Sequence, residues 1–477
     1  TLTRRQMLGV AGWAAAGLVL GNRGTALARP AGRPLPPLHR LRQHRAAPGL
    51  VEAVLAAEPR TVRAGGVDAE LWTYNGSFPG PLLRVREGDR VRLWLENALQ
   101  EETNLHLHGL HVDPGVDDPF LSVSSGDTHL YEFDVPQGSR GLHWYHPHVH
   151  GHVARQLFAG LAGPILVDGD DEPLELDGAD DRIVVLKDLA IRDGAPEPHS
   201  FVDWRRGKEG DLLLVNGALD PVLVASRGLL RLRFLNASNA RYYRLALEDH
   251  VFHLIATDGH PLAEPLLVDE ILLAPGERAE ALVALDRPGR FALLDLPYDR
   301  GAGMMGMGGM GAPGPGPQRV PLRLMTVVRS ARRRSYALPS SLATPEDLRG
   351  REPDVTRRLV LAEGMMMGGG FTIDGRTFDP DRVDLAARLD TLEVWEIENR
   401  GFMDHPFHLH TYPFQLLSTN GAPAGSVVWK DVVNIRSGGV VRIAVPLRDF
   451  AGRTVYHCHI VEHEDRGMMG TLGVVPG

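Results

Sequence analysis

Residues 457–468, near the C-terminus, concentrate side chains that bind soft and borderline transition metals. They include Cys458, the only cysteine of the chain, together with three histidines and one methionine. If residues 456–460 form a β-strand, His457 and His459 point to one face and Cys458 points to the other, because side chains alternate along a strand. One strand can therefore serve two metal sites at once.

The strand face that carries Cys458 predicts a metal site with a thiolate ligand. Cys458 can join His463, one further histidine and Met468 as a weak axial thioether ligand. A trigonal His2Cys site with a long bond to methionine is typical of blue copper. The alternative is that Cys458 is a small buried hydrophobic residue and the histidines lie on the surface.

Histidines with H-x-H spacing recur in four clusters, at residues 106–108, 146–148, 405–410 and 457–459. On a strand, this spacing places both imidazoles of a pair on one face. Two clusters lie toward the N-terminus and two toward the C-terminus. They can meet only if the first and last domains share an interface.

The number of donors indicates how many ions they can hold. If His405 completes the blue site, eight histidines remain: His106, His108, His146, His148, His408, His410, His457 and His459. Imidazole suits copper, and eight nitrogens suit three copper ions, two with three ligands each and one with two ligands and water. For any single pair, a structural, hydrogen-bonded histidine is the alternative.

The pattern outside these clusters predicts an all-β protein. Short alternating runs are separated by Gly and Pro, which is typical of β-sandwiches. Three alternating strands that end in Asn, at 91–97, 229–236 and 392–399, suggest one sandwich repeated three times. We expect domains at 50–168, 179–330 and 350–477, the last with the blue copper site.

Length and composition agree with an exported globular protein. The chain has 477 residues and a net charge of -9, so nucleic acid is not an expected partner. Residues 1–28 combine Arg4-Arg5, a short apolar stretch and an A-x-A cleavage signal, which predicts a twin-arginine signal peptide. Residues 29–49 would form a leader, and the apolar stretch is too short for a stable membrane span. We expect a periplasmic or extracellular monomer that uses the twin-arginine export machinery.

The four clusters, HLHG at 106, HWYHPH at 143, HPFHLH at 405 and HCHIVEHEDRGMM at 457, resemble the copper motifs of multicopper oxidases, the laccase and cuprous oxidase family. The resemblance implies three cupredoxin-like Greek-key domains and four copper ions: one type 1, one type 2 and two type 3. The trinuclear cluster would lie between domains 1 and 3. Motif by motif, the resemblance makes the type 1 ligands His405, Cys458, His463 and Met468, and the type 2 ligands His106 and His408. One type 3 ion would have His108, His146 and His459, and the other His148, His410 and His457.

Such an enzyme oxidises one-electron donors at the type 1 copper and reduces dioxygen to water at the cluster. Cys458 is covalently joined through the backbone to His457 and His459, which gives the electrons a route. Protons are also needed, and the resemblance makes Asp117 and Glu464 candidate donors. The alternative for both carboxylates is plain solvated surface charge.

The electron donor is less clearly indicated. Residues 301–317 and Met365, Met366 and Met367 form Met/Gly-rich segments that could collect Cu(I), since thioether sulfur prefers cuprous ion. Met403 and Asp404 could pass the ion to the type 1 site, which would place the protein in copper homeostasis. We therefore expect Cu(I), phenols or aromatic amines as reductants. The alternatives are a general laccase with incidental Met loops, and a non-enzymatic copper-binding or structural protein on the same scaffold.

Overall fold

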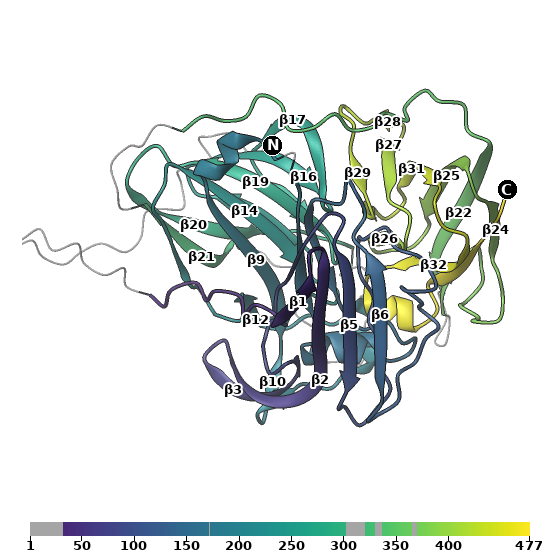
Figure 1. Cartoon of the computed structure of the whole chain (residues 1–477), viewed down its shortest axis with the longest axis horizontal. Coiled ribbons are helices and arrows are strands. Elements are labelled where there is room, and N and C mark those ends of the chain that lie inside the picture. Colours follow the sequence, from purple (N-terminus) through teal and green to yellow (C-terminus); the bar gives the residue numbers. More distant parts are fainter. Residues whose placement is uncertain (1–31, 171, 302–319, 330–335, 365–369) are drawn as a thin grey trace, which may run out of the picture. The chain divides into compact units, whose positions relative to one another are not determined.

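The computed structural model describes residues 32–170, 172–301, 320–329, 336–364 and 370–477. Strands dominate this part of the chain and form three β-sandwiches in sequence order (Figure 1). This architecture confirms the predicted all-β class. Among the described residues, no helix has the length and apolar character needed to cross a membrane.

The first sandwich contains a five-stranded sheet, with path β1-β2-β5-β6 and β3 paired to β2, and a three-stranded sheet β4-β8-β7. Its strand β5 alternates as predicted, with Val91, Leu93 and Leu95 fully buried. Its elements are β1 (Gln43–Ala47), β2 (Leu50–Ala64), β3 (Val67–Tyr74), β4 (Leu83–Arg86), β5 (Arg90–Asn97), β6 (Thr128–Asp134), β7 (Gly141–Tyr145), α2 (Val153–Ala159) and β8 (Gly163–Asp168).

The second sandwich packs a six-stranded sheet, β12-β9-β14-β19-β16-β17, against a five-stranded sheet, β13-β21-β20-β15-β18. Its elements are η1 (Leu174–Gly178), β9 (Asp180–Leu189), β10 (Ile191–Arg192), β11 (Ala195–Pro196), α3 (Phe201–Arg206), β12 (Leu212–Val215), β13 (Val222–Ala225), β14 (Leu229–Asn236), β15 (Tyr243–Leu247), β16 (Phe252–Thr257), β17 (His260–Val268), β18 (Ile271–Leu273), β19 (Arg278–Ala284), β20 (Gly289–Leu296) and β21 (Leu322–Arg329).

The third sandwich has a seven-stranded sheet, with path β23-β22-β25-β31-β27-β28 and β29 paired to β27, and a five-stranded sheet β24-β33-β32-β26-β30. Its elements are β22 (Val355–Glu363), β23 (Phe371–Ile373), β24 (Leu385–Arg388), β25 (Thr391–Asn399), β26 (His405–Leu409), β27 (Phe414–Thr419), β28 (Ala422–Pro423), β29 (Trp429–Lys430), β30 (Val432–Ile435), β31 (Val440–Leu447), β32 (Gly452–Cys458), α4 (Val461–Asp465) and β33 (Met469–Val475).

All three sandwiches repeat one pattern of strand pairing. In the larger sheets, β5, β14 and β25 each have a parallel neighbour on one side and an antiparallel neighbour on the other. In the smaller sheets, β8, β21 and β33 do the same. Parallel neighbours require the chain to cross between sheets, as Greek-key sandwiches do.

The asparagine at the end of each repeated strand closes the same turn. Asn97, Asn236 and Asn399 are buried, and each Oδ1 accepts a hydrogen bond from the backbone N–H two residues later. Each Nδ2 donates to two backbone carbonyls, which for Asn399 are those of Met403 and Ile435. In the third sandwich this turn leads directly to His405, so the repeated motif positions a candidate ligand.

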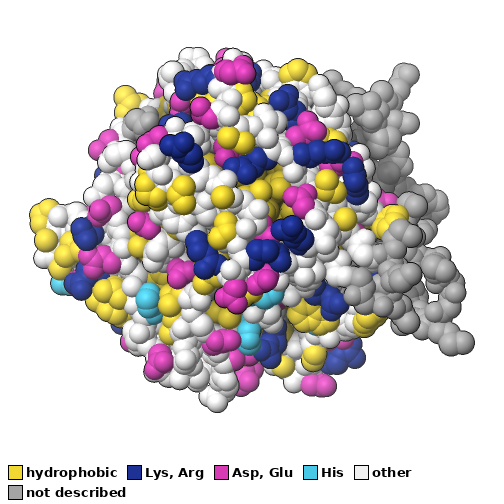
Figure 2. All heavy atoms as spheres, turned by 90° about the vertical axis from the view of Figure 1, so that its right-hand side faces the viewer, with side chains coloured by type: hydrophobic (Ala, Val, Ile, Leu, Met, Phe, Trp, Pro, Cys, Tyr) yellow, Lys and Arg dark blue, Asp and Glu magenta, His cyan; other side chains and the backbone are white. Residues whose placement is uncertain are grey.

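One hydrophobic cluster joins the three sandwiches. Trp144 of β7, Leu157 of α2, Leu235 of β14 and Val461 of α4 belong to it and are fully buried. This cluster holds α4, and with it His463, against elements from the first and second sandwiches. Outside the cores, charges of both signs are interspersed on the face of the molecule drawn in Figure 2.

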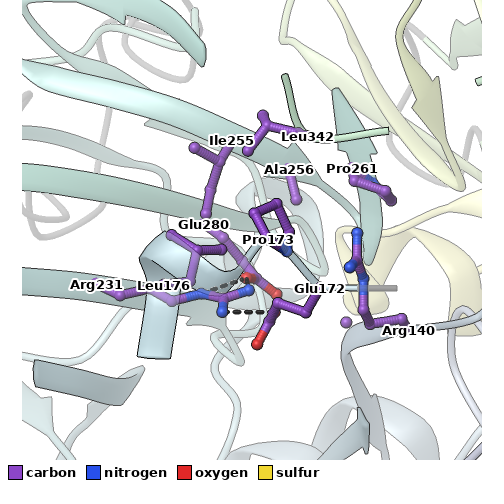
Figure 3. Close-up of a pocket in the computed structure, with 11 residues that line it drawn as sticks. Arg140, Glu172, Pro173, Leu176, Arg231, Ile255, Ala256, Pro261, Glu280 and Leu342 are labelled. Atoms are coloured by element: carbon purple, nitrogen blue, oxygen red, sulfur yellow. Dashed lines mark hydrogen bonds and ion pairs between the residues drawn. The ribbon is translucent and has the colours of Figure 1, made fainter. Parts of the chain in front are cut away.

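Strand β14 is buried along its whole length, although Arg231 and Arg233 alternate with apolar residues in it. Arg231 and Arg233 point from it to Glu280 of β19, and Arg231 also reaches Glu172. Figure 3 shows the Arg231 guanidinium between these two carboxylates. Ion pairing makes burial of the arginines tolerable, since each charge has an opposite partner.

Candidate metal centres

Three predicted copper donors meet at one end of the third sandwich. His405 begins β26, Cys458 ends β32, and these two strands pair with Phe407 opposite Cys458. His463 lies on the short helix α4 that follows. Cys458 Sγ is 3.3 Å from His405 Nδ1 and 3.7 Å from His463 Nδ1, and the two Nδ1 atoms are 3.3 Å apart. All three side chains are fully buried, so the group forms a closed His2Cys set.

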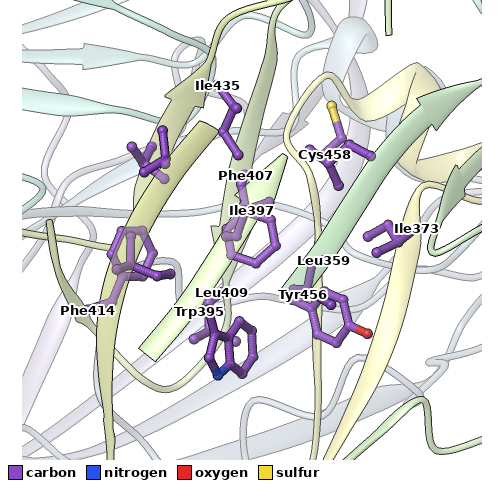
Figure 4. Close-up of a cluster of buried hydrophobic side chains, with 14 of the residues drawn as sticks. Leu359, Ile373, Trp395, Ile397, Phe407, Leu409, Phe414, Ile435, Tyr456 and Cys458 are labelled. Carbon is purple, nitrogen blue, oxygen red and sulfur yellow. The ribbon is translucent and has the colours of Figure 1, made fainter. Parts of the chain in front are cut away.

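Met468 is held next to this group by the main chain. The Cys458 N–H donates to the Met468 carbonyl (3.0 Å), and the Met468 N–H donates to the His463 carbonyl (2.9 Å). The Met468 side chain is fully buried in the same cluster as Cys458. Figure 4 shows the Cys458 sulfur at the opposite end of this cluster from Trp395. The axial role of Met468 stays a prediction.

The donor chemistry of this first group fits copper. Burial holds the pKa of His463 well below its ordinary value, so its imidazole is neutral and can offer a lone pair. Burial raises the pKa of the Cys458 thiol well above its ordinary value. A bound cation overcomes this effect, because it deprotonates a coordinating thiol. Imidazole and thiolate are ligands that copper accepts readily.

The outer side of His405 carries a residue that sequence reasoning missed. Glu363 Oε1, at the end of β22, is 3.0 Å from His405 Nε2 and accepts hydrogen bonds from the N–H groups of Phe402 and Met403. Its Oε2 has no partner among the described residues. An outer carboxylate of this kind orients a histidine ligand and increases its basicity. The sequence feature that could have pointed to Glu363 is its position two residues before the methionines at 365–367.

The four H-x-H clusters converge where the first and third sandwiches meet. His106 and His146 form an antiparallel bridge in the first, and His408 lies opposite His457 in the third. Across the interface, His106 Nε2 is 3.2 Å from His408 Nε2. Within the first sandwich, His108 Nδ1 is 3.3 Å from His146 Nε2. The interface that the clusters required is therefore present.

A further trio of nitrogens crosses the same interface. The Nε2 atoms of His148, His410 and His457 lie 3.1 to 3.2 Å from one another. The His459 ring lies beside the cluster, with its centroid 5.0 Å from that of His108 and 5.5 Å from that of His146. Neither ring nitrogen of His459 has a hydrogen-bond partner among the described residues. The division of these histidines among three ions stays a prediction.

The orientation of the rings also fits copper. His408 Nδ1 lies 2.8 Å from the Asp431 carbonyl, and His457 Nδ1 lies 3.0 Å from the Cys458 carbonyl. His106 Nδ1 lies 2.8 Å from Asp117 Oδ2. If these outer nitrogens carry the protons, the Nε2 atoms are unprotonated and their lone pairs face one another. Burial keeps the pKa of His106 and of His408 well below the ordinary value, so neutral rings meet there and a bound cation removes the repulsion between their lone pairs.

The two predicted carboxylates are both buried, so neither is a solvated surface charge. Asp117 accepts a hydrogen bond from the Leu107 N–H at 2.8 Å and contacts His106. Glu464 Oε2 is 3.2 Å from His457 Nδ1, and its Oε1 is 3.4 Å from His148 Nε2. Burial raises the pKa of Glu464 well above its ordinary value, which favours the protonated acid beside the cluster.

The predicted Cu(I) contacts differ in what the structure shows. Met403 is buried beside His405, and its carbonyl accepts the Asn399 bond. Asp404 is buried too, with Oδ1 accepting from the Ser437 N–H and Oδ2 from the Tyr298 hydroxyl at 2.5 Å. Both carboxylate oxygens of Asp404 therefore already accept hydrogen bonds from other groups of the protein. Met365, Met366 and Met367 lie outside the described residues.

A second residue missed from the sequence is Asp431. Its Oδ1 lies 3.0 Å from His108 Nε2, and its carbonyl lies 2.8 Å from His408 Nδ1. It therefore contacts the outer nitrogens of two predicted ligands. The only available signal was a charged pair, Lys430 and Asp431, at the start of an apolar strand.

Comparisons with known proteins agree with this geometry. Three family profiles described as multicopper oxidase match residues 56–172, 183–303 and 350–477. The chain is 34% identical to the multicopper oxidase mco of Staphylococcus haemolyticus over 412 residues, covering 84% of this chain and 83% of that protein. It is 33% identical to the cell division protein FtsP of Edwardsiella tarda over 497 residues, covering 100% and 99%. Among solved structures, a Campylobacter jejuni multicopper oxidase described as a metallo-oxidase has a TM-score of 0.84 at 30% identity, covering 94% and 96%. A Pediococcus acidilactici laccase has a TM-score of 0.81 at 31% identity, covering 93% and 94%. This chain belongs to the multicopper oxidase family.

Proposed function

We propose that this protein is an oxidase that couples the one-electron oxidation of a small reductant to the four-electron reduction of dioxygen to water. Copper bound at the two donor groups would supply both half-reactions, with one type 1 ion accepting single electrons and one type 2 and two type 3 ions reducing dioxygen. One observation carries the proposal. Cys458 and His457 are adjacent residues, yet their side chains belong to two separate groups of buried donors.

The proposed ligand roles are those that the resemblance to the family implies. His405, Cys458, His463 and Met468 would hold the type 1 ion, and His106 and His408 the type 2 ion. The two type 3 ions would be held by His108, His146 and His459, and by His148, His410 and His457. The close contacts of His106 with His408, and of His148 with His410 and His457, support these sets.

The residues between the two groups perform the transfer steps. The backbone from Cys458 to His457 offers an entirely covalent route from one donor group to the other. Glu464 contacts both His457 and His148, so it is placed to hold a proton and release it at the cluster. Asp117 keeps the His106 ring oriented through a buried carboxylate contact.

Cu(I) is the reductant that the surroundings of His405 favour, with phenols and aromatic amines as less selective donors. Glu363 Oε1 lies 3.0 Å from the outer nitrogen of His405, and the other oxygen of this carboxylate, Oε2, has no partner among the described residues, so a cation suits this carboxylate. Residues 365–367 add soft sulfur donors shortly after Glu363 in the sequence, and 301–317 is a second Met-rich segment. The Campylobacter jejuni relative is itself described as a metallo-oxidase.

Dioxygen uptake by the copper-loaded protein tests the oxidase proposal. With Cu(I) or a phenol as donor, the wild-type chain should consume one dioxygen per four electrons without releasing peroxide. A matched Cys458→Ser protein should lose the blue absorption band and nearly all uptake. Wild-type protein with a full complement of copper but no uptake with either donor would contradict an enzymatic function.

Deletion of residues 301–317 tests the preference for Cu(I). Cu(I) oxidation should fall while phenol turnover and the blue band stay at wild-type levels. If both activities remain unchanged, this segment plays no part in substrate binding and the general laccase alternative gains support.

The similarity to FtsP over the whole chain favours a second candidate, a non-catalytic role on the same scaffold. The full set of twelve predicted ligands argues for the oxidase, since a protein without redox chemistry has no need of them. Absence of copper binding by the purified chain would favour the non-catalytic role.

We also propose export through the twin-arginine pathway, based on the pattern at Arg4-Arg5. Residues 1–31 lie outside the described residues. Replacing both arginines with lysine should retain the protein in the cytoplasm, and unchanged export would exclude this route.

A further inference from the structure

The second sandwich contains none of the predicted copper ligands, yet its residues contact the trinuclear histidines. We propose that the second sandwich holds these histidines in position through Arg278, which fixes the Asp431 carboxylate by a bidentate ion pair. Asp431 in turn orients His108 and His408. The inference rests on the proposed function, since it concerns how that copper cluster is assembled, and it makes Arg278 and Asp431 positioning residues.

Asp431 is shared by two histidines from different sandwiches. Its side chain lies 3.0 Å from His108 Nε2, and its backbone carbonyl lies 2.8 Å from His408 Nδ1. If each of these outer nitrogens carries a proton, His108 Nδ1 and His408 Nε2 are unprotonated and each offers a lone pair. Those atoms are the ones that face His146 and His106. Asp431 thus selects both the tautomer and the orientation of two rings.

Arg278, the first residue of β19, fixes the Asp431 carboxylate. Its Nη1 donates to Oδ1 at 2.7 Å and its Nη2 donates to Oδ2 at 2.5 Å, and both side chains of this bidentate pair are buried. Its remaining donors go to the backbone carbonyls of Leu142, Gly276 and Asp258. All five N–H groups of the guanidinium are therefore used. Because Leu142, Gly276 and Asp431 belong to different sandwiches, one side chain ties the three together at the cluster.

A second set of contacts holds residues 430–432 of the third sandwich. Lys430 Nζ donates to Asp258 at 3.0 Å and to Glu277 at 3.1 Å. Asp258 Oδ2 also accepts the backbone N–H groups of Asp431 and Val432, at 3.3 and 3.2 Å. The second sandwich therefore holds the backbone whose carbonyl contacts His408, as well as the Asp431 side chain.

The turn that leads into β19 also touches a predicted ligand directly. Gly276 has a φ of +84°, and a Cβ atom built there would lie 2.8 Å from Cδ2 of His459. The absence of a side chain lets the backbone approach the imidazole this closely. This contact lies on the same stretch as Arg278, so the turn supports the cluster at two points.

Loss of Arg278 should affect the trinuclear cluster selectively. Without the guanidinium, the Asp431 carboxylate is buried beside the histidines with its strongest partner missing, and it must move or be protonated. The contact with His108 then changes. The type 1 donors depend on other contacts, since His405 bonds to Glu363 and the Met468 carbonyl accepts from Cys458. The two copper sites should therefore respond differently.

The experiment compares copper-loaded Arg278→Met with a matched control, Arg231→Met. Arg231 is also a buried arginine of the second sandwich, and its carboxylate partners are Glu280 and Glu172 (Figure 3), neither of which is hydrogen-bonded to a predicted copper ligand among the described residues. Arg278→Met should keep the blue type 1 band, lose copper from the cluster and change the type 2 electron paramagnetic resonance spectrum. Arg231→Met should lose stability but keep the wild-type spectrum. Unchanged type 2 spectra in Arg278→Met, or the same loss in both variants, would overturn the proposal.

Two further variants cover the case in which Arg278→Met does not fold. Asp431→Asn removes the charged partner of His108 but keeps the size of the side chain, so it should fold, keep the blue band and hold less copper in the trinuclear cluster. In the double variant Arg278→Met/Asp431→Asn, the neutral amide needs no cation, so cluster copper should recover relative to Arg278→Met. Wild-type copper content of the cluster in Asp431→Asn contradicts the proposal.

A measurement on metal-free protein separates this inference from the proposed function. Nitrogen NMR of labelled histidines should show His108 protonated at Nε2 in the wild type, and a changed tautomer population in Asp431→Asn. This result does not depend on dioxygen uptake. A wild-type chain that consumes no dioxygen but shows this tautomer would overturn only the oxidase proposal.

Discussion

His148 Nε2 and His457 Nε2 lie 3.2 Å apart, although 309 residues separate them in the chain. His457 is directly followed by Cys458, whose sulfur points to the other side of the strand and lies 3.3 Å from His405 Nδ1. The contact between His148 and His457 therefore joins the first sandwich to a strand that also reaches the His2Cys group. Disturbing either end should give separable effects on the two copper sites.

Glu464→Gln should leave the blue band intact and slow dioxygen reduction by about 100-fold or more, the usual effect of losing a general acid. The amide keeps the shape of the side chain beside His457 but cannot release a proton. Turnover with saturating reductant measures the effect. The matched control is Glu462→Gln on the same helix, where the carboxylate faces His199 and Asn239. Unchanged turnover in Glu464→Gln would remove this residue from the mechanism.

Asp117→Asn should weaken type 2 copper binding about 10- to 100-fold, as the loss of an outer hydrogen-bond partner usually does. The buried carboxylate contacts His106 at 2.8 Å and also accepts from the Leu107 backbone, so its replacement loosens the His106 ring. Dialysis against a chelator, followed by electron paramagnetic resonance, measures the retained type 2 signal. Retention equal to that of the wild type would show that Asp117 does not support this ligand.

If Met468 is the weak axial ligand of the proposed type 1 copper, Met468→Leu should raise the reduction potential of that site, because leucine donates nothing to the metal. Met468 is fully buried within the hydrophobic cluster, and a Met-to-Leu change in a core usually costs less than about 1.5 kcal/mol of stability. The fold should therefore persist. A redox titration followed at the blue band gives the potential, and a lower value would argue against Met468 as the axial ligand.

Asp295 of β20 should make stability depend on pH. Burial raises the pKa of its carboxyl from 3.8 to about 7. The folded state therefore holds the proton more tightly than the unfolded state, and the stability gained at low pH is lost as pH rises through 7. Each pKa unit corresponds to about 1.4 kcal/mol, so the total effect amounts to a few kcal/mol.

Asp295→Asn mimics the protonated carboxyl at every pH. It should raise the thermal midpoint more at pH 8 than at pH 5, as measured by calorimetry of the metal-free protein. Equal shifts at both pH values would show that ionisation of Asp295 does not control this stability.

The sequence by itself indicated the donor types, their H-x-H spacing and the three Asn-terminated strands, because these features are local. Alternation along β32 is a property of any extended chain, so the divergence of His457 and Cys458 followed directly. One detail differs. The predicted strand continued to Ile460, whereas β32 ends at Cys458, where the Met468 carbonyl accepts the Cys458 N–H and the chain turns into α4.

Only the tertiary structure decided which groups support the donors. Asp431 meets His108 across 323 residues, and Glu363 meets His405 across 42. No periodicity links residues so far apart, because such contacts depend on how whole sheets pack. The sequence could not predict that Asp404, Asp117 and Glu464 are buried. An acidic residue looks the same in a sequence whether its side chain is exposed or lies in a core. Arg278 shows the difference most clearly: its five hydrogen bonds exist only because three sandwiches meet around it.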